Sequence, residues 1–503
     1  MKISIIGLAD DRFNRPLQLI ANLFFEESQI LKAYNEENDV QIKFTLKEEA
    51  NVSVSAELKD SAGNIIYSDY QKEMLPSNSE KERFKQIKNA VAHVYLTVLQ
   101  DWTKITQKWG ILTGIRPTKL LHRKVRDGIS SELAHQQLKD DYLITDEKIE
   151  LMQQIVDRQL TVVPDLYSLQ EEVSIYIGIP FCPTKCAYCT FPAYAINGRQ
   201  GSVESFLGGL HYEMRKIGEW LKEKGVRITT VYFGGGTPTS ITANEMDMLY
   251  EEMYTSFPDV EHIREITVEA GRPDTITLEK LEVLKKWNID RISINPQSYT
   301  QETLKAIGRH HTVVETIDKY HLARSKGMNN INMDLIIGLP GEGISEFVHS
   351  LAETEKLMPE SLTVHTLSFK RASEMTKNKE KYKVAEREEV EKMMGLAQVW
   401  TKDHGYVPYY LYRQKNILGN LENVGYCIPN QESIYNIMIM EEQQTIIGLG
   451  CGAASKFIEP STGKITHFAN PKDPKTYNDS YETYTEDKLN ILDEIFSKKS
   501  SLA

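Results

Sequence analysis

Residues 172–370 alternate between short apolar segments and amphipathic helical segments, and this alternation restricts the fold more than any other feature of the chain. Helical stretches such as 204–222 and 277–287 separate the apolar segments. Six units of this kind in series predict a parallel sheet that curves into a partial (β/α)6 barrel, an α/β fold whose active site lies at the carboxyl ends of the strands. The expected strands are 173–179, 229–233, 265–270, 291–295, 331–337 and 362–367.

Two further regions flank the expected barrel of residues 172–370. Residues 1–165 mix strands and helices and predict an N-terminal α+β domain, whereas residues 385–503 predict a C-terminal domain of mainly helical or mixed structure. In the first region the segment 109–119 carries two glycines and a proline among basic residues, and it is either a helix-connecting loop or a loop that faces a ligand. The expected elements there are strands 41–46, 52–58 and 64–70 and helices 81–108 and 145–159.

Composition excludes several classes of protein. The net charge of −12 opposes sequence-independent binding of nucleic acid, which needs a cationic surface. No apolar run approaches the roughly 18 residues of a membrane-spanning helix. The apolar start of the chain becomes polar at Asp10, which is too early for a signal peptide and fits a first strand. Three of the five cysteines lie within eight residues, which favours a reducing cytoplasm and a metal or cluster site over disulfides.

The three clustered cysteines, Cys182, Cys186 and Cys189, form a C-x3-C-x2-C motif directly after the first expected strand of the barrel. Thiolates are the usual protein ligands of iron–sulfur clusters, and three of them leave one iron open for another ligand. A zinc site would need a fourth ligand, and no further His or Cys is adjacent. Chance placement or structural thiols are the remaining alternatives. The motif favours a four-iron cluster.

Glycines and polar residues recur at the ends of the later strands. The segment Gly234-Gly235-Gly236-Thr237 ends the second strand, and without Cβ atoms its backbone can face a ligand closely, although a plain turn would also use glycine. Polar side chains inside or just after apolar strands are costly unless they are paired or ligand-bound. We therefore expect a ligand at these strand ends, with surface or internally paired residues as the alternative. The polar residues are Glu269, Gln297, Arg309 and Asp334.

These motifs resemble the radical S-adenosylmethionine (SAM) superfamily and, within it, the oxygen-independent coproporphyrinogen III oxidase family, most closely its HemZ branch. The match covers about residues 172–480. It rests on the segments 176–182, 234–239, 292–298, 309–311, 334–341 and 419–426. The resemblance implies a [4Fe-4S] cluster held by Cys182, Cys186 and Cys189, whose open iron chelates the amino and carboxylate groups of SAM. An electron delivered to the cluster then releases a 5′-deoxyadenosyl radical.

The resemblance also implies which residues contact one or two molecules of SAM. The first SAM would contact Tyr176, Tyr188, Gly235 and Glu269. A second would contact Gly236, Thr237, Gln297, Arg309, Asp334 and Ser368, and Ala454 matches another position that lines SAM. The implied partners are a tetrapyrrole substrate and a one-electron donor such as flavodoxin or ferredoxin. The implied reaction is oxidative decarboxylation of coproporphyrinogen III propionates to vinyl groups, which gives protoporphyrinogen IX for haem biosynthesis.

The chain departs from the family pattern at three places, and other functions remain as alternatives. Gly178 replaces the usual histidine, Phe191 replaces a fourth cysteine, and Asn295-Pro296-Gln297 replaces a run of small residues. One alternative is a haem chaperone, for which Cys427 could ligate the iron. Another is radical methylation or opening of haem. Substrate carboxylates need cations, and the candidates are Lys370, Arg371, Arg413 and Lys415, with solvated surface charge as the alternative.

Overall fold

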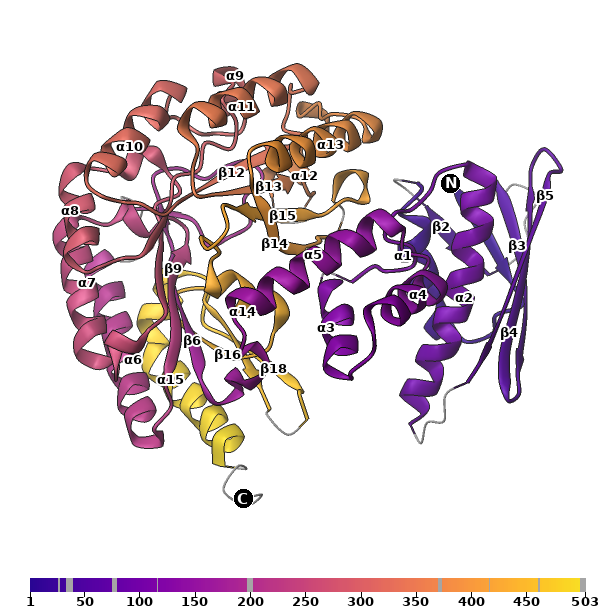
Figure 1. The fold of residues 1–503 in the computed structure, drawn as a ribbon, viewed down its shortest axis with the longest axis horizontal. Coiled ribbons are helices and arrows are strands. Elements are labelled where there is room, and N and C mark those ends of the chain that lie inside the picture. Colours follow the sequence, from indigo (N-terminus) through magenta and orange to yellow (C-terminus); the bar gives the residue numbers. More distant parts are fainter. Residues whose placement is uncertain are drawn as a thin grey trace. The chain divides into compact units, whose positions relative to one another are not determined.

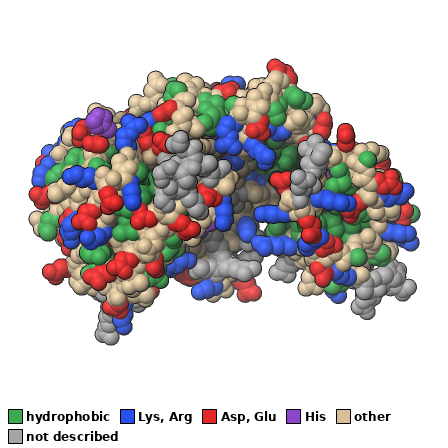
Figure 2. Space-filling view, turned by 90° about the horizontal axis from the view of Figure 1, so that it is seen from below, with side chains coloured by type: hydrophobic (Ala, Val, Ile, Leu, Met, Phe, Trp, Pro, Cys, Tyr) green, Lys and Arg blue, Asp and Glu red, His purple; other side chains and the backbone are tan. Residues whose placement is uncertain are grey.

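The computed structural model divides the chain into two compact units, Met1–Val156 and Asp157–Ala503. Neither unit has, within its described residues, a helix that is long and apolar enough to cross a membrane. On the face shown in Figure 2, basic and acidic side chains are interspersed over much of the surface. The structure describes residues 1–25, 28–32, 39–74, 79–114, 116–196, 202–369, 373–415, 417–459 and 462–497.

The first unit is built on a five-stranded sheet in the order β2-β1-β3-β4-β5. The meander β3-β4-β5 is antiparallel, and the turn after Asp60 joins β4 and β5 as a hairpin. Inward-facing residues alternate along β4, where Val52, Val54, Ala56 and Leu58 are buried. The strands are β1 (Lys2–Ile6), β2 (Gln29–Leu31), β3 (Val40–Glu48), β4 (Asn51–Asp60) and β5 (Ile65–Glu73).

Four helices and the first part of a fifth, α5, complete this unit, and α1 and α2 contribute to its apolar core. The segment 109–119 runs between α2 and α3, with Trp109 fully buried and Ile111 N–H bonded to the Tyr142 carbonyl at 2.9 Å. These contacts fit the helix-connecting alternative, and Ile115 lies outside the described residues. The helices are α1 (Asn14–Ala21), α2 (Glu80–Thr103), α3 (Thr118–Arg126), α4 (Ser131–Tyr142) and α5 (Asp146–Val162). The expected pattern omitted α3 and α4, whose short, largely polar sequences show no clear apolar period.

The second unit contains the expected barrel, which is confirmed strand by strand. Six strands pair in parallel and in sequence order, and helices such as α6, α7, α8 and α11 cover the outer face of the curved sheet (Figure 1). The strands are β6 (Val173–Ile179), β9 (Ile228–Gly235), β10 (Glu265–Glu269), β11 (Arg291–Ser293), β12 (Ile331–Ile337) and β13 (Ser361–Thr366). The helices are α6 (Val203–Lys224), α7 (Ala243–Ser256), α8 (Leu278–Lys286), α10 (Val313–Ser325) and α11 (Ile344–Leu357).

Residues 385–503, expected as a separate domain, add five strands to both edges of this same sheet. On one side β15 and then β14 continue antiparallel from β13, and on the other side β16 pairs in parallel with β6 and leads into the hairpin β17-β18. Without these added strands, β6 and β13 would be edge strands with unpaired N–H and C=O groups, and the added strands pair with those groups. The strands are β14 (Val407–Tyr412), β15 (Asn423–Cys427), β16 (Thr445–Gly450), β17 (Ala454–Ile458) and β18 (Ile465–Ala469).

Three helices of this region pack onto the barrel sheet. The helix α13 (Arg387–Asp403) packs against α11. The helix α14 (Ile434–Glu441) starts at the amino end of the sheet, where the Glu265 carboxylate accepts from Ser433 Oγ and from two N–H groups of the first turn. The helix α15 (Pro474–Ser497) packs along α6.

Candidate cluster and SAM site

The cysteine segment, residues 182–189, lies at the carboxyl ends of β6 and β9. It begins in the short strand β7 (Phe181–Cys182) and is followed by the short strand β8 (Tyr194–Ala195). Hydrogen bonds tie it to neighbouring loops: Thr184 Oγ1 donates to the Gly308 carbonyl at 3.1 Å, and Ala187 N–H to the Ile307 carbonyl at 3.0 Å. Cys182 Sγ lies 3.2 Å from Thr237 Oγ1. The segment is therefore fixed by the barrel before any ligand is added.

The three thiols are close neighbours without converging on one point. Burial raises the pKa of Cys182 to about 11, and the nearby Cys186 and Cys189 add to the shift. Three side chains that share one metal ion must bring their ligand atoms close together. Among the described residues, one set of His, Cys, Asp or Glu side chains has its ligand atoms all within 4.8 Å of one another: the exposed Asp259, Glu261 and His262. The cysteine sulfurs do not meet that spacing. The wider spacing of the three sulfur atoms disfavours one shared zinc ion and fits a cubane, in which each thiolate binds its own iron.

Gly235 and Gly236 need to be glycine because the backbone of residues 179–181, directly before the cysteine segment, lies against them. Gly235 has a φ of +110°, and a Cβ on it would lie 2.8 Å from the Ile179 carbonyl oxygen. A Cβ on Gly236 would lie 2.6 Å from the Phe181 oxygen and 3.1 Å from Cys182 Sγ. The glycines thus allow the end of β9 to approach the cysteine segment closely.

Buried polar atoms without partners gather beside the cysteine segment. Arg309 Nη1 donates to the Asn295 carbonyl at 2.7 Å, and its guanidinium neighbours Tyr188 and Cys186. Among the described residues, however, no hydrogen-bond partner exists for the buried atoms Ser293 Oγ, Asn295 Oδ1, Arg309 Nε and the two ring nitrogens of His311. Orphaned buried polar atoms are rare in folded proteins, because each costs about 1–3 kcal/mol. Ser293 and Asn295 lie at the end of β11, and Arg309 and His311 follow the short helix α9 (Gln301–Ala306); together these atoms fit a polar ligand such as SAM.

Two acidic side chains, Glu269 and Asp334, lie near each other on the inner face of the sheet. Burial raises the pKa of Glu269 to about 7, with the charge of Asp334 adding to the shift, although Tyr232 Oη donates to Glu269 at 2.5 Å. Tyr232 belongs to a stack of three rings with Tyr176 and Tyr435 of α14. A cationic ligand would relieve the repulsion between the two carboxylates, and SAM carries a sulfonium and an ammonium group.

A polar chain that extends from Asp334 was not expected from the sequence. Asp334 Oδ2 lies 3.4 Å from His365 Nε2, and His365 Nδ1 lies 3.2 Å from Tyr412 Oη. Burial raises the pKa of Asp334, but His365 and the hydrogen bonds from Asn332 and Thr363 together outweigh it and bring the pKa below the ordinary range. Alternation along β13 places His365 on the same face as Thr363. This alternation is the feature of the sequence from which the position of His365 could have been predicted. Tyr412 comes from β14, which joins the sheet by pairing with β15, and β15 in turn pairs with β13.

The remaining expected SAM contacts lie beside other strands of the sheet. Gln297 has a φ of +67° and joins β12 by backbone bonds, because its N–H donates to the Asp334 carbonyl at 2.9 Å. Ser368 follows β13, and its Oγ donates to the Lys415 carbonyl at 2.8 Å. Ala454 is exposed at the start of β17. Ser368 and Ala454 thus lie beside opposite ends of the parallel run of strands.

Two expectations about the substrate end need correction. Arg413 follows β14 at the carboxyl edge of the sheet, but it is not a free surface cation: it is buried, it donates to the Asn420 and Leu421 carbonyls, and burial lowers its pKa to about 10. Cys427 is fully buried in an apolar cluster with residues such as Tyr409 and Ile437, so it is not placed to ligate haem. Lys415 is exposed, and Lys370 and Arg371 lie outside the described residues.

The departures from the family pattern have local explanations. Gly178 pairs with Gly450 of β16, and a Cβ on it would lie 3.0 Å from the Cys451 carbonyl oxygen, which leaves little room for a histidine. Phe191 projects its ring to solvent, with 57% of the residue exposed. At this position no side chain is available as a fourth thiolate.

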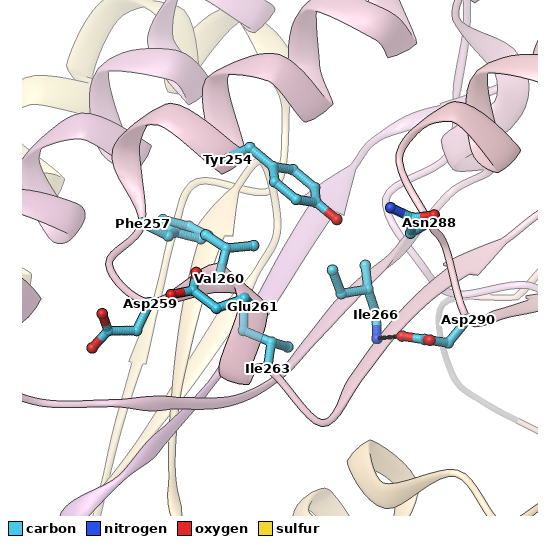
Figure 3. Close-up of a pocket in the computed structure, with 9 residues that line it drawn as sticks. All are labelled: Tyr254, Phe257, Asp259, Val260, Glu261, Ile263, Ile266, Asn288 and Asp290. Carbon is cyan, nitrogen blue, oxygen red and sulfur yellow. Dashed lines mark hydrogen bonds between the residues drawn. The ribbon is translucent and has the colours of Figure 1, made fainter.

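A pocket elsewhere on the barrel is separate from the cysteine segment (Figure 3). It lies at the amino ends of β10 and β11, where Tyr254, Ile266 and Asp290 contribute to its lining. Asp290 Oδ2 accepts from the Ile266 N–H at 2.8 Å, and Tyr254 Oη donates to the Trp287 carbonyl at 2.8 Å. These two polar groups therefore already have partners, and the exposed carboxylates of Asp259 and Glu261 also line the pocket.

The raised pKa of Glu269 predicts that SAM binding depends on pH. A carboxyl with a pKa of about 7 is ionised above pH 7 and neutral below it, so a cationic ligand binds more weakly as the pH falls. If binding needs the ionised form, affinity falls about tenfold from about pH 8 to about pH 6. Equilibrium binding of SAM measures this. Glu269→Gln should bind weakly at every pH and lose the slope; a slope that persists in this variant would assign it to another group.

Comparisons with known proteins agree with this architecture. The model of the radical SAM superfamily matches residues 176–353. The oxygen-independent coproporphyrinogen-III oxidase-like protein HemZ of Bacillus subtilis (strain 168) is 71% identical over 499 residues, 99% of each chain. The heme chaperone HemW of the same organism is 28% identical over 323 residues, which are 63% of this chain and 80% of the relative.

A solved structure also resembles the chain. It is the coproporphyrinogen III oxidase HemN from Escherichia coli, described as a radical SAM enzyme, with a TM-score of 0.50 and 19% sequence identity. The match covers 68% of this chain and 74% of that one. At this identity the likeness supports the fold, and the expected barrel class is confirmed.

Proposed function

Because the chain belongs to the family of oxygen-independent coproporphyrinogen III oxidase-like radical SAM proteins, we propose that it decarboxylates propionate side chains of a porphyrinogen. The proposed substrate is coproporphyrinogen III and the proposed product is protoporphyrinogen IX. The observation that carries the proposal is the full-length identity of 71% with the oxidase-like relative. The cysteine segment and two carboxylates on one inner face of the barrel support it.

The proposed reaction removes a hydrogen atom and carbon dioxide from each of two propionates. A [4Fe-4S] cluster and SAM, when bound, supply a 5′-deoxyadenosyl radical that takes the hydrogen atom from the substrate carbon. The bond to the carboxylate carbon then breaks, a vinyl group forms, and one electron passes to a one-electron acceptor. Flavodoxin or ferredoxin is the proposed donor of the electron that starts each cycle.

The chain's own residues would bind and orient the reactants. Cys182, Cys186 and Cys189 would hold the cluster. Arg309 and the unpartnered atoms of Ser293 and Asn295 suit the carboxylate and amino group of SAM, and Glu269 and Asp334 suit its hydroxyl and cationic groups. Binding of a second SAM is a further part of the proposal, for which the candidates are Gly236, Thr237, Gln297, Arg309, Asp334 and Ser368. Ala454 is a further candidate for lining SAM.

The test is anaerobic incubation of reconstituted protein with SAM, a one-electron reductant and coproporphyrinogen III, followed by mass analysis. We expect a divinyl product and at least two 5′-deoxyadenosines per product, because each vinyl group needs one hydrogen abstraction. The same preparation of Cys186→Ala is the matched control and should yield neither compound.

The alternative function, haem binding without this reaction, has a distinct outcome. It predicts 5′-deoxyadenosine without any vinyl product, together with stoichiometric haem binding. The relatives named HemW are heme chaperones, which motivates this arm of the test. The burial of Cys427 and of the surrounding strand β15 speaks against the haem ligand that the sequence suggested.

A further inference from the structure

Arg272 lies directly beside the cysteine segment, and neither the motifs nor the proposed reaction accounts for it. It follows β10, and 4% of its side chain is exposed. Its Nη1 lies 3.1 Å from Thr184 Oγ1, 3.3 Å from the Thr184 carbonyl oxygen and 3.8 Å from Cys186 Sγ. We propose that Arg272 is a positioning residue that holds the cysteine segment and sets the reduction potential of the cluster through its hydrogen bond to Cys186.

A second contact fixes the direction of this guanidinium. Its Nε and Nη2 donate to the two oxygens of Asp274 at 3.0 Å and 2.9 Å, a bidentate pair that leaves Nη1 aimed at the cysteine segment. The backbone is held as well, because Thr275 Oγ1 donates to the Arg272 carbonyl at 2.7 Å. A lysine could not reproduce this, since its single ammonium has no planar fork.

The charges around Cys186 favour the reduced cluster. Two buried guanidiniums, Arg272 and Arg309, face this cysteine, and the Asp274 carboxylate is paired with Arg272. His311 adds no charge, because burial and the two arginines lower its pKa to about 3 against the opposing effect of Asp274. Reduction adds one negative charge to the cluster, and a buried cation nearby stabilises that charge more than water would. Hydrogen bonds to cluster sulfurs act in the same direction.

The inference rests on the proposed ligation by the three cysteines, and it is independent of the tetrapyrrole reaction. It makes two predictions of opposite sign. Arg272→Gln removes the cation and should lower the potential, whereas Asp274→Asn removes a negative charge, keeps the cation and should raise it. For Arg272→Gln we expect at least a tenfold lower ratio of reduced to oxidised cluster at a fixed solution potential, about 59 mV for one electron.

The measurement is an anaerobic redox titration followed by electron paramagnetic resonance, without SAM or substrate and with iron content determined for each protein. Arg264→Gln is the matched control. Arg264 pairs with both oxygens of Asp165 in the same manner but precedes β10, at the opposite end of the strand from the cysteine segment. Its variant should titrate like the wild type.

The results separate the possibilities. Opposite shifts in Arg272→Gln and Asp274→Asn support the proposal, and wild-type potentials in both variants with full iron content overturn it. If Arg272→Gln takes up little iron, Asp274→Asn decides: a raised potential supports the proposal, and an unchanged or lowered one overturns it. Because no substrate is present, absence of vinyl product from the wild type would overturn the proposed function alone.

Discussion

Alanine at Cys182, Cys186 or Cys189 is expected to abolish the cluster, so that iron falls from about four atoms per chain to background and the visible absorbance of the cluster disappears. A cluster with one open iron depends on all three thiolates, and no other described thiol lies in the segment that could replace one. Anaerobic reconstitution followed by iron analysis and absorbance spectroscopy measures the effect.

The two remaining cysteines provide matched controls. Cys427 and Cys451 are both buried, so their alanine variants remove a thiol of the same kind and test for general damage to the fold. Both variants should retain nearly full iron content. If Cys451→Ala lost iron as completely as Cys186→Ala, the assignment of three ligands would be wrong.

The second large effect is expected at a buried ion pair between two helices that pack against each other. Lys488 of α15 and Glu213 of α6 are both fully buried, with 2.8 Å between Nζ and Oε1. The Glu213 carboxylate also accepts from Gly450 N–H, Asn470 Nδ2 and Tyr477 Oη, and Lys488 donates to the Gly448 carbonyl. Lys488→Met leaves Glu213 charged and buried without its cation. Removing one partner of such a pair costs about 3–5 kcal/mol of unfolding free energy.

Chemical denaturation, followed by a signal from the barrel, measures the loss as a lower unfolding midpoint. The double variant Glu213→Gln/Lys488→Met should recover part of it, because the unpaired charge is then removed as well. The exposed pair Lys216–Glu219 lies on the same helix α6, and its alanine variants should change the free energy by less than about 1 kcal/mol. Equal losses at the two pairs would show that burial is not the cause.

Local patterns in the sequence were sufficient for the architecture of the barrel. Each strand and the helix that follows it are short, contiguous segments, so their apolar periodicity is visible without tertiary contacts. The rule that active sites lie at carboxyl ends then placed the cysteine motif and the glycines on the correct edge of the sheet. The structure brings Glu269 and Asp334 to this inner face and Arg309 to the side of Cys186, as the recurrence of polar strand ends suggested.

Contacts between distant segments were beyond the reach of such patterns. Tyr412 meets His365 across 47 residues only because β15 pairs between β13 and β14. Tyr410 Oη likewise lies 3.1 Å from Thr363 Oγ1. Gly425 of β15 makes room for this contact, because a Cβ at that position would overlap the Tyr410 ring. Without knowledge of this pairing, residues 385–503 had the pattern of a separate domain.

The sequence by itself determined the barrel, the cysteine segment and the glycine turn, because each is encoded by neighbours in the chain. Only the tertiary structure decided what surrounds them. Arg272 reaches Cys186 across 86 residues, and Lys488 reaches Glu213 across 275. The same principle reversed the expectation for Arg413, whose charge in the sequence resembles that of any surface arginine and whose burial depends on the fold. Charge can be read from composition, but burial and pairing follow from packing alone.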